Sequence, residues 1–120
     1  MPLEPAIVGN HNTAMGYQAL YKNTTGNSNV AVGTGALYKN TTKFNLVAIG
    51  DSALYNNGVG AISNQAEGNV AVGSKSLFSN TRGGGNTAIG FESLFKNTTG
   101  SSNTSVGRQS LYNSINSANN

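Results

Sequence analysis

The sequence predicts an all-β fold, a parallel β-roll or β-solenoid of six coils of 17 residues, and three regularities indicate it. Valine or isoleucine alternates with a small residue in most coils, directly before a recurring glycine. Leucine and then tyrosine or phenylalanine lie four and five residues after that glycine. The glycine itself recurs with steps of 17, 17, 23, 17 and 17 residues, as Gly16, Gly33, Gly50, Gly73, Gly90 and Gly107. A fixed short period of this kind is typical of stacked repeats.

The composition agrees with an ordered but weakly charged repeat. Charged residues make up 9% of the 120-residue chain and apolar residues 37%, against roughly 25% and 45–50% in ordinary domains. Disordered chains usually lack apolar residues in strict register, so we expect the repeats to be ordered. The net charge of +3 is scattered and forms no basic stripe, which argues against nucleic-acid binding. No apolar run approaches the roughly 20 residues that cross a bilayer, so we expect no membrane insertion.

In chain order, we expect residues 1–8 to form an N-terminal segment, residues 9–114 the six coils, and residues 115–120 a C-terminal tail. Ala6, Ile7 and Val8 could add a partial strand that covers the first coil. Each coil should begin with a short strand such as Val30-Ala31-Val32, whose two valines lie on one face and whose alanine lies on the other. Equivalent strands should stack in parallel, about 4.8 Å apart.

The second half of each coil carries the leucine and the aromatic residue. We expect a two-sided roll with a shorter second strand here, although a single helical turn also fits. Since one apolar row cannot bury itself, the leucines should face the valine and isoleucine row. The predicted scaffold core is therefore Met15, Val32, Ile49, Val72, Ile89 and Val106 together with Leu20, Leu37, Leu54, Leu77, Leu94 and Leu111.

Asparagines form two further columns, and their stacked amides can hydrogen-bond along a ladder. One column is Asn12, Asn29, Asn69, Asn86 and Asn103, and the other is Asn23, Asn40, Asn57, Asn80 and Asn97. Three members of the second column begin Asn-Thr-Thr sequences, and Asn103-Thr104-Ser105 also fits the glycosylation pattern. Repetition generates this weak pattern automatically, so turn chemistry is the better interpretation.

One connection breaks the period. The segment from Gly58 to Gly68 is six residues longer than its equivalents, and we expect it to bulge from the side of the roll. Long connections often carry function, whereas regular ones carry the scaffold. The candidate contacts for a partner are Val59, Ala61, Ile62, Asn64 and Gln65. Alternatively, its apolar residues fold back to cap a gap or join an oligomer interface.

We expect no catalytic residue, no metal site and no cofactor, and hence no enzyme. Glu4, Asp51, Glu67 and Glu92 lie at different phases of the repeat, so no pair is placed for acid–base chemistry. His11 has no partner at metal-ligand spacing. The sequence Gly83-Gly84-Gly85 lacks the Lys-Ser/Thr of a phosphate loop and indicates a flexible corner.

Self-association is expected from two columns. The alanine column permits close approach of a second surface, and the six aromatic residues would otherwise form an exposed apolar stripe. Such a stripe usually marks an interface, so we expect a homo-oligomer.

The sequences Asn-Val-Ala-Val-Gly and Asn-Thr-Ala-Ile-Gly resemble the head repeats of trimeric autotransporter adhesins, whose motif is Asn-Ser-Val-Ala-Ile-Gly. The longer array, with Asn-Thr-Ala-x-Gly-x-x-Ala/Ser-Leu-x-x-Asn-Thr-Thr, is similar to arrays in phage and viral tail-fibre-like proteins and in bacterial surface proteins. The resemblance covers about residues 9–114.

The resemblance implies a homotrimer of left-handed rolls that lies outside the cell, on a virion or a bacterial surface. It implies a rigid stalk or adhesive head that mediates attachment. The partners would be further copies of the chain and a host-surface glycan or protein. The alternative is a lectin-like or ice-binding solenoid in which a repeated corner makes the contacts.

Overall fold

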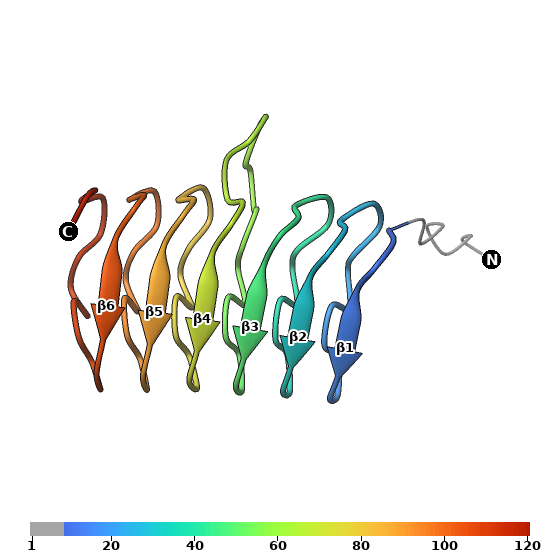
Figure 1. Cartoon of the computed structure of the whole chain (residues 1–120), viewed down its shortest axis with the longest axis horizontal. Coiled ribbons are helices and arrows are strands. Elements are labelled where there is room, and N and C mark those ends of the chain that lie inside the picture. The colour runs from blue at the N-terminus through green and yellow to red at the C-terminus, as the bar shows by residue number, and fades with distance from the viewer. Residues whose placement is uncertain (1–8) are drawn as a thin grey trace.

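The computed structural model describes residues 9–120 as one parallel sheet of six short strands stacked in chain order (Figure 1). Equivalent residues pair, so that Ala31 lies opposite Ala48, and Val32 opposite Ile49. Each coil takes the number of the strand with which it begins. These residues contain no helix, and the prediction of a six-coil β-solenoid is confirmed for the single chain. The expected partial strand at Ala6 to Val8 lies outside the described residues. The strands are β1 (Thr13–Met15), β2 (Val30–Val32), β3 (Val47–Ile49), β4 (Val70–Val72), β5 (Thr87–Ile89) and β6 (Thr104–Val106).

The recurring glycine makes the corner that ends each strand. Its φ lies between 123° and 133° in all six coils, a region that residues with a Cβ avoid. The corners also stack backbone against backbone. A Cβ added at Gly50 would lie 2.6 Å from the carbonyl carbon of Gly73 in the next coil. Both the conformation and the close approach therefore require glycine.

The expected second strand does not form. The chain instead makes successive turns, in which the N–H of Ala36 donates to the carbonyl of Gly33 and that of Tyr38 to the carbonyl of Gly35. The leucine of every coil has a φ of 50–54°, which is left-handed and excludes an extended strand. Neighbouring coils still pair along this segment, as where the N–H of Leu37 donates to the carbonyl of Ala53. The segment thus forms a stacked wall without strand geometry.

The interior contains the leucines and the alanines of the strands. Leu20, Leu37, Leu54, Leu77 and Leu94 are buried as predicted, and Leu111 in the last coil is 38% exposed. The prediction that Met15, Val32, Ile49, Val72, Ile89 and Val106 belong to the core is wrong for the single chain, because these side chains lie on the outer face of the sheet. Ala31, Ala48, Ala71 and Ala88 point inward instead and are 0% exposed. A coil this narrow has room only for a small side chain at this position, which is alanine in coils 2 to 5 and serine in coil 6.

Both asparagine columns are buried, apart from the half-buried Asn12, and bind the backbone. In coil 4, the Nδ2 atoms of Asn69 and Asn80 both donate to the carbonyl of Gly83, each at 2.8 Å. The same pair of bonds closes coils 1, 2 and 5, at the carbonyls of Gly26, Lys43 and Gly100. Asn80 also donates to Oδ1 of Asn57 at 2.9 Å and accepts from Asn97 at 3.0 Å, which makes the expected amide ladder. The other column uses Oδ1 differently, since that of Asn69 accepts the backbone N–H of Asn86.

Candidate functional site

The long connection projects beyond the row of corners between β3 and β4 (Figure 1). We call residues 59–64 the insertion, because Gly58 and Ala66 still occupy regular positions. The N–H of Gly58 pairs with the carbonyl of Thr81, and the carbonyl of Ala66 accepts from Asn57. Two turns order the segment, since the N–H of Ala61 donates to Gly58 and that of Gln65 donates to Ile62. The coil below is therefore intact and carries the segment as an addition.

The structure brings the five predicted contact residues together in and beside the insertion. Val59 is 45% exposed and Ile62 is 70% exposed, so these apolar side chains do not fold back onto the roll. Asn64 is also exposed, whereas Ala61 and Gln65 are half-buried. Oε1 of Gln65 accepts the N–H of Ile62 at 3.1 Å and closes the turn. Gln65 thus shapes the segment, and the exposed surface comes from the other residues.

Lys43, which the sequence interpretation missed, anchors the insertion. Its side chain is 6% exposed, and its Nζ donates to the carbonyl of Ser63 at 2.6 Å. Glycine occupies the equivalent position in coils 1, 4 and 5, as at Gly26. A Cβ at Gly26 would lie 2.3 Å from Oδ1 of Asn23, and the glycines of coils 4 and 5 show similar close contacts, so these three coils exclude a side chain here. The break in the glycine column was the signal in the sequence that pointed to Lys43.

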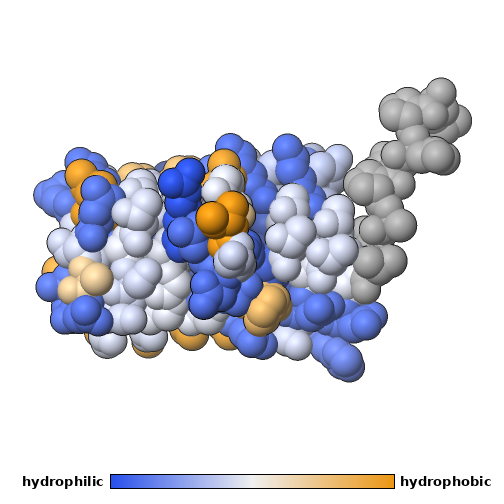
Figure 2. Space-filling model, turned by 90° about the horizontal axis from the view of Figure 1, so that it is seen from above, coloured by the Kyte–Doolittle hydropathy of each residue, from blue (hydrophilic) through white to orange (hydrophobic). Residues whose placement is uncertain are grey.

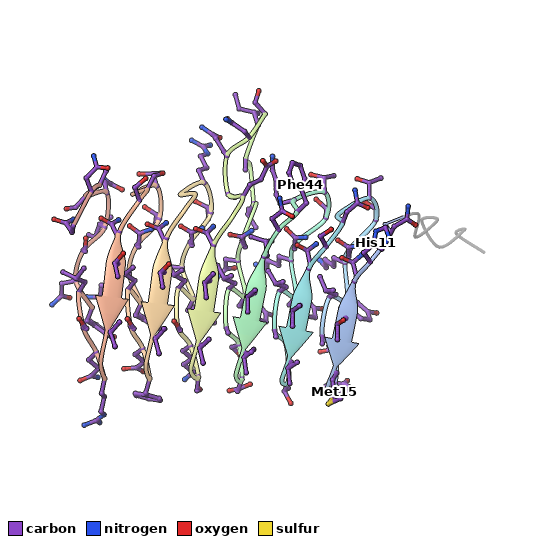
Figure 3. The ribbon with its side chains drawn as sticks, viewed as in Figure 1. His11, Met15 and Phe44 are labelled. Atoms are coloured by element: carbon purple, nitrogen blue, oxygen red, sulfur yellow. The ribbon has the colours of Figure 1, made fainter. Side chains whose placement is uncertain are left out.

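Apolar surface continues beside the insertion. Phe44 is 40% exposed on coil 2, at the foot of the insertion (Figure 3), and its carbonyl accepts the N–H of Gly68 at 3.4 Å. Seen from above, hydrophobic atoms stand in the middle of a mostly hydrophilic face (Figure 2). A rigid apolar projection with a polar surround has the chemistry of a protein contact.

A second apolar surface is the outer face of the sheet. It carries the valine, isoleucine and methionine side chains on either side of the inward alanines. Met15, at the end of β1 (Figure 3), is 66% exposed, and Ile49, Ile89 and Val106 are 39%, 41% and 65% exposed. Six strands in register align these four residues, with Val32 and Val72, into one row, and the second outward row contains valine in β2, β3 and β4 and threonine in β1, β5 and β6. An apolar face of this kind favours packing against another protein surface.

The aromatic column is a continuous stack. Rings in adjacent coils lie 4.9–5.4 Å apart between centroids, with interplanar angles of 1–20°. Lys22, Lys39 and Lys96 place Nζ 5.4–5.8 Å from the centroid of a tyrosine in the next coil. The ring faces between coils are therefore covered, and only their edges are available to a partner. The aromatic column therefore stabilises the contact between coils, and it leaves less apolar surface open to a partner than the sequence predicted.

Other candidate motifs have structural explanations. The amides of Asn23, Asn40, Asn97 and Asn103 are buried and hydrogen-bonded, so the glycosylation-like sequences serve the turns, as the sequence interpretation favoured. His11 is exposed at a corner of the first coil (Figure 3). Within residues 9–120 no group of three His, Cys, Asp or Glu residues could hold a metal ion. No helix in this part of the chain is long and apolar enough to cross a membrane.

Protein families, curated proteins and solved structures were all compared with the chain, and none of them matches it.

Proposed function

We propose that the chain is a structural and adhesive module on the surface of a virion or cell, and that the insertion makes the attachment contact. The observation that carries the proposal is the insertion itself, in which Val59 and Ile62 are exposed on an ordered, anchored segment. Apolar side chains exposed to water are unfavourable unless a partner covers them. The resemblance to adhesin heads and tail fibres supports the same role.

The scaffold suits a role in presenting a contact surface. Each coil binds the next through strand pairing, stacked corners, stacked rings and buried amides, so the array has several independent connections at every step. In such arrays each repeat contacts its neighbours, and an addition at one corner leaves the pairing on either side in place. The insertion is thus held at a fixed position along a stiff body.

The module is further proposed to be a homotrimer that assembles through the outer face of the sheet. The exposed row that contains Ile49 and Ile89 supplies the apolar surface, and the resemblance supplies the number of copies. Light scattering should give three times the chain mass of 12.3 kDa at micromolar concentration. A single-chain mass under those conditions would refute this part of the proposal.

Deleting residues 59–64 tests the attachment role. Lys43 should become glycine in the same variant, because the restored regular coil would have no space for its side chain. The labelled protein is incubated with a panel of intact bacterial and animal cells, and binding is measured by flow cytometry. We expect the parent to bind at least one cell type. The deletion variant should keep the parent's circular dichroism spectrum and number of chains per particle but lose binding.

A second variant keeps the insertion but replaces its two exposed apolar side chains, with Val59→Ser and Ile62→Ser together. This variant should also lose binding if the apolar residues make the contact. Unchanged binding by the deletion variant would place the contact elsewhere. The ice-binding alternative gains no support, because the insertion interrupts the threonine corner at Gly58 and hydroxyls such as that of Thr24 donate to backbone carbonyls.

A further inference from the structure

A hollow lies beside the insertion, on its C-terminal side. Three successive coils line this open hollow, whose volume of about 530 Å³ is within the roughly 300–1,000 Å³ of small-molecule sites. Coil 3 and the insertion supply one wall with Asn64 and Glu67, and coil 5 supplies the other with Ser102. The floor is coil 4, where Gly84 and Gly85 present bare backbone.

The fold does not require glycine at position 85. Its φ is 67°, but Ser28, Asn45 and Ser102 occupy the equivalent position in other coils with φ of 56–59°. A Cβ at Gly85 would have its nearest neighbour, Oγ of Ser102, at 3.8 Å, which is an ordinary contact. Serine or asparagine would therefore fit here, and its absence leaves the hollow open.

The groups around the hollow are polar and include one cation and one anion. Arg82 reaches across to the insertion, where a Cβ at Gly60 would lie 3.5 Å from its Nη2 atom. Within residues 9–120, neither the guanidinium of Arg82 nor the carboxylate of Glu67 makes a hydrogen bond or an ion pair. The side-chain amide of Asn64 and the hydroxyl of Ser102 are equally uncommitted in this part of the chain. Donors and acceptors thus converge on one space with their hydrogen-bonding capacity unused.

We propose that this hollow binds an acidic saccharide. The guanidinium of Arg82 would donate two N–H bonds to the sugar carboxylate, the arrangement that makes arginine selective for planar anions. Glu67 would accept hydrogen bonds from hydroxyls of the ring, and Asn64 and Ser102 would exchange hydrogen bonds with further hydroxyls. The bare backbone at Gly85 lets the ring approach closely. The inference extends the proposed attachment function, because the bound sugar would be the host-surface glycan beside the apolar contact of the insertion.

The test is a titration of the ¹⁵N-labelled full chain, followed by nuclear magnetic resonance, with N-acetylneuraminic acid, glucuronic acid and neutral glucose. We expect at least one acid to shift the amide signals of Gly84, Gly85 and Ser102 at millimolar concentration, and glucose to bind at least tenfold more weakly. Gly85→Asn, which fills the hollow, and Arg82→Gln, which removes the charge, should each raise the Kd of that acid at least tenfold. Gly68→Asn is the matched control, since Gly68 occupies the equivalent position of coil 3 and an added Cβ there meets nothing within 4 Å.

Failure of both acids to shift these signals would overturn the inference, as would equal affinities of the Gly85→Asn and Gly68→Asn variants. Cell binding separates this result from the proposed function. If deletion of residues 59–64 abolishes attachment while Gly85→Asn preserves both attachment and sugar affinity, the attachment role stands and the saccharide site does not. If Gly85→Asn loses the acid but keeps attachment to cells, the saccharide site stands and the cells are held by another contact.

Discussion

The amide ladder should be the most sensitive part of the scaffold, and Asn80 tests it. Asn80 is 0% exposed, donates to Asn57 and Gly83 at 2.9 and 2.8 Å, and accepts from Asn97 at 3.0 Å. Asn80→Ala removes these three hydrogen bonds, each of which contributes about 0.5–1.5 kcal/mol. The partners keep other bonds, as Gly83 keeps its bond from Asn69, so none loses every partner. We expect the free energy of unfolding to fall by about 2–3 kcal/mol.

Asn80→Asp should cost more, because it replaces a donor with a charged acceptor. The new carboxylate would face two acceptors, Oδ1 of Asn57 and the carbonyl of Gly83, in a site closed to water. An unpaired buried charge of this kind costs about 3–5 kcal/mol. Burial raises the pKa of the introduced carboxyl above its unfolded value, so the penalty grows as the pH rises from 4 to 7. The penalty shrinks as the pH falls through that raised pKa, since the protonated form can donate one hydrogen bond.

Urea unfolding followed by circular dichroism at pH 7 and pH 4 measures these differences, with the parent protein at each pH as the reference. Asn27→Asp is the control, because Asn27 is exposed and its Oδ1 keeps its role as acceptor for the N–H of Asn10. The argument fails if Asn80→Asp unfolds no more easily than Asn80→Ala at pH 7. It also fails if the gap between Asn80→Asp and the parent is the same at both pH values.

Four further substitutions test the corner, the two faces of the sheet and the anchor. Gly73→Ala places a methyl group 2.6 Å from the backbone of the next coil at a φ of 130°, so the melting temperature should drop by an amount that matches a loss of more than about 3 kcal/mol. Ala48→Asp should unfold the chain, whereas Ile49→Asp should leave the fold intact and abolish self-association, and light scattering with thermal melting would expose a reversed outcome. Lys43→Met should cost about 1.5–3 kcal/mol locally, seen as faster hydrogen exchange in the insertion without matching loss in the strands.

Periodicity alone was sufficient to predict the coils, the register of the strands, the buried leucines and the corner glycines. It could not decide which face of a strand points inward, because alternation defines two faces without ranking them. Choosing the larger side chains for the interior was wrong, since the coil is too narrow for them. The better signal was uniformity. The inward position is alanine in five coils, whereas the outward positions vary among Met, Val, Ile and Thr.

The second segment shows a different limit of sequence reasoning. Leucine rarely adopts a left-handed conformation, because its Cβ crowds the backbone, so a residue with φ near 50° at every leucine could not be expected from propensity. The stacked array stabilises it by burying each leucine and by pairing its N–H with the next coil. Tertiary contacts repeated along the array thus override a local preference.

The departures from the repeat around the insertion form one structural unit. Lys43 replaces the glycine of coils 1, 4 and 5, and Leu46, fully buried, replaces the asparagine before β3. The amide ladder also breaks at this point, where Oδ1 of Asn40 has no hydrogen-bond partner in the described part of the chain. An addition that served no purpose would need no such changes in the coil before it. Here the preceding coil lacks the glycine, one asparagine amide and one ladder hydrogen bond of the regular coils, and its Lys43 holds the insertion by donating to the carbonyl of Ser63. That arrangement favours an insertion that must hold one shape, as a recognition surface does.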